Sequence, residues 1–425
     1  LQTSPTATTA PAFGGLVADW LEDEVRQRRS VRCAFISTNS ICQGEQVGVL
    51  WSWMLAQGVH LHFAHRTFQW SNDAPGKAAV HCIIVGFGMT PRKPRLFDYE
   101  DIKGQAHEVA VTQLNPYLVD APTVLLPKRS KPICEVPEIG IGNKPIDDGN
   151  YLFTTEERDA FLKLEPKAKK YFRRWLGADE FLNGYERWCL WLGDCSPAEL
   201  AAMPHALKRV QAVRKFRNRS ASAPTQAIAD KPTRFHVENF PASAYLVIPE
   251  VSSEKRKFLP IAFEKPPTIC SSLVKLLPNA SLYEFGILSS TMHNAWMRYT
   301  CGRLGSGYRY SVGIVYNNYP WPNAPSDKQR QAIEVAAQGV LDARAIHQSG
   351  KAPASLANLY NPDTMPPNLV QAHKRLDKAV DACYVAQAKA ADKERGVGGS
   401  ALELKTDAER VAYLFMLYQR ITRLL

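Results

Sequence analysis

Apolar positions in the first hundred residues alternate between helical and extended spacing. Residues 16–28 and 47–55 repeat large apolar side chains every three or four positions, which predicts two amphipathic helices. Three short apolar runs predict strands, at residues 31–36, 59–64 and 78–87. This order of helices and strands is what remains of an α/β sheet whose first half is missing. We therefore expect residues 1–125 to hold the last strands of such a sheet.

The pattern changes twice further along the chain. Between residues 91 and 150, prolines and glycines interrupt short extended pieces, which predicts a domain boundary. Residues 126–322 mix helical and extended patterns and are rich in Arg, Tyr and Trp, so we expect an α+β domain there. Helical periodicity dominates after Pro322, and residues 323–425 are predicted to form a helical domain.

Capping signals mark the helices of this last region. Ser326 with Gln329, and Thr406 with Glu409, fit the capping-box pattern that begins a helix. A third helix is predicted between them, over residues 369–391. The joining segments are rich in Pro or Gly, as expected of connections between helices.

Composition narrows the class of protein. The 425 residues are 45% hydrophobic, enough to bury the cores of two or three domains. The 52 basic and 41 acidic residues give a net charge of +11, which favours a polyanionic partner. Nine cysteines without a C-x-x-C pair indicate reduced, mostly buried thiols of a cytoplasmic protein. No apolar stretch approaches the length of a membrane span, so we expect no membrane partner. The chain starts without Met, which predicts that the natural chain begins earlier.

Three histidines superficially resemble a metal site. His60, His62 and His65 lie on or just after a predicted strand, where residues two apart share a face. No carboxylate or cysteine stands close by in the sequence to complete a ligand shell. We therefore expect ordinary polar strand positions and no metal.

The segment from Leu207 to Arg219 is the strongest basic feature. Apolar residues recur at every third position and would seat a helix, while six cations and no acid surround them. One interpretation is a solvated charged helix. The other is a helix that contacts phosphates, because unopposed cations repel each other unless a polyanion offsets the repulsion. The candidate phosphate contacts are Lys208, Arg209, Arg214, Lys215 and Arg217.

A second candidate surface lies between Ser289 and Ser311. A buried helical face is predicted to end at Gly302, and three glycines in six residues then predict a loop rich in arginine and hydroxyl groups. Such a loop can present bidentate donors to the edges of bases, although the same composition suits any polar surface loop. The candidate base contacts are Arg298, Arg303, Ser306, Tyr308 and Arg309.

Several longer motifs resemble those of a known family. Residues 35–47 (FISTNSICQGEQV) closely resemble a signature of the MmeI-like (type IIL) restriction–modification methyltransferases. The resemblance continues through residues 65–70, 187–192 and 251–256, and through 285–322, which ends in YNNYPWP. It runs from about Leu16 to the end of the chain.

This resemblance implies a role in DNA modification. The family is similar to adenine-N6 DNA methyltransferases, which use S-adenosylmethionine and an Asn-Pro-Pro-aromatic catalytic motif. Residues 1–125 would then be the end of a class I methyltransferase sheet and residues 126–322 a target-recognition domain that reads double-stranded DNA. The 425 residues contain neither the catalytic tetrad nor a glycine-rich cofactor loop. We therefore expect a fragment that binds no cofactor by itself, with S-adenosylmethionine and the N-terminal methyltransferase half belonging to the full-length protein.

One residue of the methyltransferase part receives a specific role from the resemblance. Phe68 is predicted to lie in the loop between two strands and to stack on an adenine flipped out of the duplex, with Trp70 as the reserve candidate. Two alternatives stay open. The chain could be a stand-alone DNA-binding module that works with a separate catalytic subunit, or part of an enzyme that modifies RNA.

Overall fold

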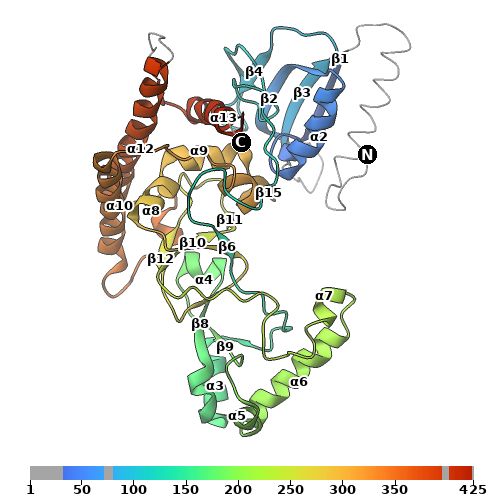
Figure 1. Ribbon diagram of the computed structural model, residues 1–425, viewed down its shortest axis with the longest axis vertical. Coiled ribbons are helices and arrows are strands. Elements are labelled where there is room, and N and C mark those ends of the chain that lie inside the picture. The colour runs from blue at the N-terminus through green and yellow to red at the C-terminus, as the bar shows by residue number, and fades with distance from the viewer. Residues whose placement is uncertain (1–31, 71–79, 395–401, 424–425) are drawn as a thin grey trace.

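The computed structural model describes residues 32–70, 80–394 and 402–423 (Figure 1). The helix expected over residues 16–28 lies outside these ranges. In Figure 1 a sheet with one covering helix forms the upper right of the molecule, and long C-terminal helices form the upper left. Small sheets occupy the centre, and a lobe of short helices lies at the bottom. The protein is thus a mixed α/β structure with several small sheets and a helical C-terminal region.

The N-terminal sheet has the order β1-β3-β2-β4-β5. Its strands are β1 (Arg32–Thr38), β2 (His60–Trp70), β3 (Val80–Gly88), β4 (Arg95–Asp98) and β5 (His107–Val109). β3 is antiparallel to both β1 and β2, whereas β2 and β4 are parallel. The 3₁₀ helix η1 (Asn39–Ile41) and helix α2 (Glu45–Ala56) follow β1. The predicted strands and helix are confirmed, but β2 runs six residues past its expected end at residue 64.

Helix α2 packs through the apolar stripe that predicted it. Val47, Leu50, Trp51 and Met54 are buried, and the indole N–H of Trp51 donates to the carbonyl of Ile41 at 2.6 Å. That bond ties the helix to the turn at the end of β1. The turn and the helix therefore form one rigid unit at the carboxyl end of the strand.

The central region contains three small sheets among the described residues. The first is β12 (Ala262–Glu264), β10 (Tyr245–Pro249), β14 (Val274–Pro278) and β6 (Gly140–Ile141). The second is β11 (Val251–Ser252), β16 (Gly307–Arg309) and β15 (Gly302–Leu304). The third is β13 (Ile269–Cys270), β8 (Phe172–Leu176), β9 (Arg187–Leu190) and β7 (Leu152–Phe153). All five residues of β10 are buried, as expected of a central strand covered on both faces.

Short helices complete this region. They are α3 (Thr155–Leu164), η2 (Pro166–Tyr171), α4 (Ala178–Asn183), α5 (Pro197–Ala201), α6 (Pro204–Asn218) and α7 (Ala223–Gln226), then α8 (Leu282–Ser289), α9 (Thr291–Thr300) and the π-helix η3 (Val312–Tyr316). The lower lobe in Figure 1 has an aromatic core of its own, which includes Phe153, Trp175 and Phe235. A second, larger core joins the N-terminal sheet, the centre and the C-terminal helices.

The C-terminal region is helical. Its helices are α10 (Asp327–Gln348), α11 (Leu356–Leu359), α12 (Pro367–Glu394) and α13 (Asp407–Arg423). The capping boxes predicted at Ser326 and at Thr406 are both formed. Helix α10 packs on α12 and α8, and α13 packs on α9. The C-terminal helices thus support the helix pair α8–α9, which leads directly into β15. No helix in the described ranges is long and apolar enough to cross a bilayer.

Candidate functional site

A cavity of about 450 Å³ lies where the N-terminal sheet meets the central region. We call it the joint cavity. Asn39, at the end of β1, and Arg66 and Thr67 on β2 form one wall, while Arg303 and Tyr308 of the β15–β16 hairpin form another. β1 and β2 run in the same direction, and ligands of α/β proteins usually bind at the carboxyl ends of such strands. The joint cavity is therefore the first candidate for a binding site.

Two backbone segments meet beside the joint cavity. The N–H of Gly44 donates to the carbonyl of Thr300 at 3.0 Å. Gly44 has φ +75°, and a Cβ there would lie 3.0 Å from the Cα of Gly302. Only glycine meets both demands without strain, since other residues disfavour this φ and a Cβ would crowd the neighbouring backbone. The turn after β1 is thus packed directly against the first residue of β15.

The side chain of Gln43 extends this contact. Its Nε2 donates to the carbonyl of Arg298 at 3.1 Å, and its Oε1 accepts from Nε of Arg303 at 3.0 Å. Arg303 also donates to the carbonyl of Ser306 at 2.9 Å, and its guanidinium lies 4.2 Å from the ring centre of Tyr308. These contacts fix the arginine flat against the hairpin, in the cavity wall.

The segment predicted to be a loop after Gly302 is instead the β15–β16 hairpin. The prediction of a loop was wrong because each strand is only three residues long and glycine begins both, which hides the alternation. Tyr308 is buried, with 8% of its surface exposed, whereas Ser306 is exposed in the turn. Arg309 is 58% exposed and pairs with Glu250 at 2.9 Å. Among the candidate base contacts on the hairpin, the exposed side chains are Ser306 and Arg309.

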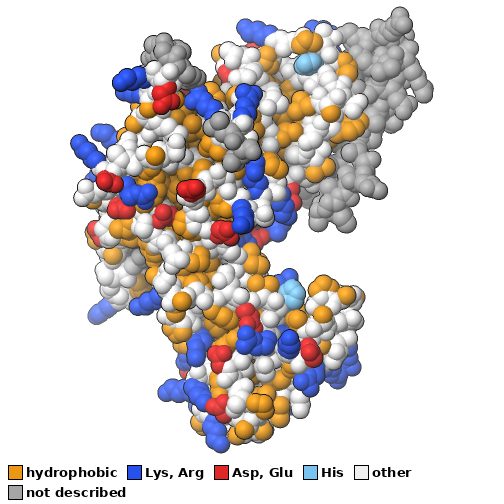
Figure 2. All heavy atoms as spheres, viewed as in Figure 1, with side chains coloured by type: hydrophobic (Ala, Val, Ile, Leu, Met, Phe, Trp, Pro, Cys, Tyr) orange, Lys and Arg blue, Asp and Glu red, His pale blue; other side chains and the backbone are white. Residues whose placement is uncertain are grey.

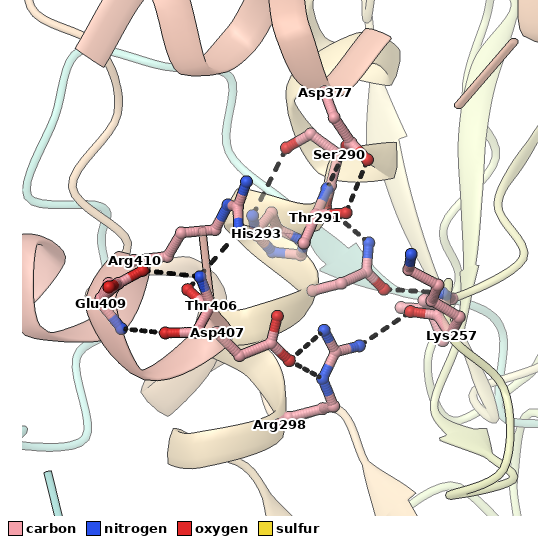
Figure 3. A network of polar contacts seen from close by, with 12 residues as sticks. Lys257, Ser290, Thr291, His293, Arg298, Asp377, Thr406, Asp407, Glu409 and Arg410 are labelled. Carbon is pink, nitrogen blue, oxygen red and sulfur yellow. Dashed lines mark hydrogen bonds and ion pairs between the residues drawn. The ribbon is translucent and has the colours of Figure 1, made fainter. Parts of the chain in front are cut away.

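Arg298 is held inside the protein (Figure 3). Its Nε and Nη2 donate to one carboxylate oxygen of Asp407 at 2.9 and 2.6 Å, and its Nη1 donates to the carbonyl of Lys257 at 2.8 Å. Figure 3 also shows Asp377 of α12 bound to Thr291 at the start of α9. These contacts commit the donors of Arg298 to joining α9 to α13 and to the 253–257 turn.

Helix α6 confirms the helix predicted over residues 207–219, but its cations serve different purposes. Arg217 is fully buried, and its guanidinium donates to five backbone carbonyls at 2.8–3.0 Å. The prediction that Arg217 contacts phosphate was therefore wrong, because no donor is free to leave the protein. Arg209 lies 4.3 Å from the ring centre of Phe153 and donates to the carbonyl of Asn150 at 2.7 Å.

The remaining cations of α6 face solvent. Lys208, Arg214 and Lys215 are exposed, and within the described ranges no acid pairs with them. Figure 2 shows the molecule hollowed between the lobe that carries α6 and α7 and the N-terminal sheet, with Lys and Arg side chains on both walls. A charged rod such as duplex DNA would find cations on either side of this hollow.

Phe68 lies on β2, not in a loop as predicted. Its ring stacks on Tyr99 with the ring centres 5.4 Å apart, and its ring centre lies 6.3 Å from that of Trp70. Trp70 is 48% exposed. Phe68 does not line the joint cavity, but its neighbours Thr67 and Tyr99 do. The β2 prediction ended too early because Arg66 and Thr67 interrupt the apolar run, and β2 bulges there.

Sequence reasoning missed several residues of the cavity wall. Arg66 forms an ion pair with Asp98 and donates to the carbonyl of Leu118 at 3.1 Å. Lys255 lines the joint cavity, and no acid pairs with it in the described part of the chain. The available signal was the family resemblance, since Asn39, Arg66 and Lys255 all lie in motifs that carried it.

The histidines on β2 make contacts within the protein. His62 Nε2 lies 2.7 Å from the carbonyl oxygen of Thr90, and His65 Nδ1 lies 2.9 Å from the hydroxyl of Tyr99. His65 also stacks on Phe97 with the ring centres 4.4 Å apart, and its partial burial lowers its pKa. No group of three or more metal-ligating side chains gathers within residues 32–70, 80–394 and 402–423.

Three family models match successive parts of this chain. The MmeI DNA-methyltransferase domain matches residues 15–98, the MmeI target recognition domain residues 120–323, and the MmeI C-terminal domain residues 324–397. The chain belongs to the MmeI family. The joint cavity therefore lies between the methyltransferase segment and the target-recognition segment of this MmeI-family chain.

Two relatives agree with this assignment. A solved structure of the type IIL restriction–modification enzyme MmeI in complex with DNA is 45% identical, covers 96% of this chain and superposes with a TM-score of 0.83. DNA methyltransferase A of Bacillus subtilis (strain 168) is 36% identical over 394 residues, which are 92% of this chain. This chain spans 52% of the former and 42% of the latter, about half the length of the relatives it matches.

Proposed function

We propose that this chain recognises a short DNA sequence for an adenine-N6 DNA methyltransferase and forms part of the pocket that holds the target base. The observation that carries the proposal is the joint cavity, which is walled by the carboxyl ends of β1 and β2 and by the hairpin of the recognition segment. An enzyme that modifies a base inside duplex DNA must turn it out of the stack into such a pocket. The joint cavity has the volume typical of small-molecule sites.

The charges around the cavity suit a nucleotide. Arg66 and Arg298 are balanced by Asp98 and Asp407, so they shape the wall without a large net charge. Lys255 has no acid partner in the described part of the chain and could neutralise a phosphate at the mouth. The exposed lysines of α6 offer a second set of phosphate contacts, on the lobe that forms one wall of the hollow in Figure 2. Duplex DNA would thus be held on both sides of the recognition segment.

We propose that S-adenosylmethionine and the catalytic tetrad come from the rest of the methyltransferase sheet. The 425 residues contain no Asn-Pro-Pro-aromatic motif and no glycine-rich cofactor loop. Among the described residues β1 has a neighbouring strand on one side only, and Ile36 on it is 52% exposed. An apolar strand edge of this kind favours pairing with a further strand. A class I sheet continued beyond β1 would bring its own carboxyl edge towards the joint cavity.

The test is motif-resolved sequencing of methylated bases in a host that expresses the full-length gene. We expect N6-methyladenine at one short asymmetric site and nowhere else above the background of an empty-vector host. Genomic DNA without such a site would overturn the proposal. Methylation that appears only when a separately encoded subunit is supplied would favour a stand-alone recognition module instead.

A further inference from the structure

The tip of the β15–β16 hairpin carries an exposed leucine. Leu304 ends β15 and is 58% exposed. Its cross-strand partner is Gly307, which has no side chain to cover it. The turn between them, Gly305 and Ser306, is exposed, and a Cβ at Gly305 would meet nothing within 4 Å. The leucine is therefore exposed at the tip of the hairpin, beside an open turn.

The two faces of the hairpin differ in what they contact. Side chains alternate along a strand, so Arg303 and its partner Tyr308 share the face that lines the joint cavity. Leu304 and Arg309 share the opposite face, which we call the outer face. Both are 58% exposed. An exposed cation and an exposed apolar side chain thus lie next to each other, one residue away from the cavity wall.

The hairpin is held along both of its strands. Gly302 packs against the backbone of Gly44, and a Cβ at Gly307 would lie 3.0 Å from the carbonyl oxygen of Ser252 on β11. Arg309 is tied through Glu250 to the buried Lys275, whose Nζ lies 2.6 Å from that carboxylate. These contacts should keep the hairpin in place when its tip packs against a binding partner.

Three cations lie in a segment next to the hairpin. The segment that follows β11, the neighbour of β16, contains Lys255, Arg256 and Lys257. Lys255 reaches the cavity, and Arg256 is half-buried with no acid paired to it in the described ranges. An exposed apolar tip, with these cations in the neighbouring segment and a base-sized pocket behind it, would suit a duplex whose phosphates are held while its base stack is opened. Proteins that unstack DNA insert leucine and similar side chains between bases.

We propose that Leu304 is a wedge that enters the base stack of the bound duplex and fills the space left when the target base moves into the joint cavity. This proposal rests on the proposed function. Arg309, on the same face, would hold the phosphate or base beside the wedge, and Arg303 behind it would line the path into the cavity. The hairpin would then keep the duplex open from one face and receive the base on the other.

The test uses the full-length protein and the site found by methylome sequencing, with 2-aminopurine in place of the target adenine. In Leu304→Ala, base flipping read by 2-aminopurine fluorescence and single-turnover methylation of a paired target should both fall about tenfold, since most of the buried apolar surface of the wedge is lost. When the target lies opposite an abasic site the base needs no wedge, and the variant should methylate within about threefold of the wild type. Leu304→Met should recover most of the loss on the paired target.

A matched control is Leu164→Ala, because Leu164 is a 65% exposed leucine at the end of α3, in the lower lobe. It should behave as the wild type in every assay. If Leu304→Ala methylates the paired target at the wild-type rate, the wedge role is wrong. It is also wrong if the methylation rate falls equally on the paired target and on the target opposite an abasic site. A wild-type protein that methylates no adenine would instead overturn the proposed function.

Discussion

At the scale of single residues, burial decides what a cation does. Arg217 stands in the same basic helix as Lys215, but helical spacing places it on the buried face with Val210 and Val213. The structure gives Arg217 five carbonyl partners, among them Pro145 and Ile146, in a segment where Ile146 has φ +49°. A β-branched residue in that conformation is strained and persists only where its surroundings hold it. Arg217 therefore holds the loop at residues 145–146 in its strained conformation.

The prediction at this scale concerns Arg217→Lys. One ammonium cannot reproduce the planar fork that reaches five carbonyls, so several buried acceptors would lose their donors. We expect the free energy of unfolding to fall by about 3 kcal/mol or more, measured by urea denaturation. Lys215→Ala, on an exposed position of the same helix, should change it by less than about 0.5 kcal/mol. If the free energy of unfolding of Arg217→Lys falls by less than about 1 kcal/mol, Arg217 does not stabilise this loop.

At the scale of elements, long periodic patterns were predictable and short ones were not. The apolar stripe of α6 and the capping boxes of the C-terminal region specify helices through local spacing, and these helices form where expected. The β15–β16 hairpin and the second half of β2 escaped prediction. The hairpin strands are three residues long, and β16 also pairs with the distant β11, while a bulge in β2 breaks the alternation before its second half pairs with β3.

The prediction at this scale concerns the exposed lysines of α6. If Lys208 and Lys215 contact phosphates, Lys208→Ala/Lys215→Ala should weaken binding to all DNA sequences alike. The log–log salt slope of affinity should flatten by up to about 1.8, because each neutralised phosphate contributes about 0.9. The measurement is fluorescence anisotropy of a labelled duplex between low and high salt.

A matched control removes the same charge elsewhere. Lys374 and Lys378 are exposed on α12, which lies on the left in Figure 1, on the side opposite the hollow seen in Figure 2. Lys374→Ala/Lys378→Ala should leave the slope unchanged. Equal slopes for both double variants and the wild type would show that α6 carries only a solvated charged face.

At the scale of the whole molecule, the candidate site depends on contacts across more than 250 residues of sequence. Gln43 meets Arg298 and Arg303, and Gly44 meets Thr300 and Gly302. Family resemblance identified both segments, yet no spacing or periodicity could show that they touch. The sequence thus indicated the parts of the site, and the fold alone reveals that the joint cavity lies between them.

The prediction at this scale compares two glycines. Gly44→Ala adds a Cβ 3.0 Å from the Cα of Gly302 at φ +75°, which costs about 1–2 kcal/mol for the backbone alone and should push the hairpin from the sheet. Single-turnover methylation by the full-length protein should fall at least tenfold, while affinity for the duplex falls less. Gly302→Ala is the control, because its Cβ would meet only the Cα of Gly44 at 4.0 Å. Equal rates for the two variants would contradict the prediction.

The packing of Gly44 against Gly302 has a consequence for hybrid proteins. The target-recognition family model covers residues 120–323, and Gln43 and Gly44 lie outside it. A chimaera that takes its recognition segment from a relative would place a foreign hairpin against the native turn. We expect such exchanges to succeed where the donor has a small residue at the position of Gly302 and keeps arginine at that of Arg303, and otherwise to require residues 43–44 from the donor as well. The unit that can be exchanged to change specificity would then consist of two separate stretches of chain that contact each other, and not of one continuous segment.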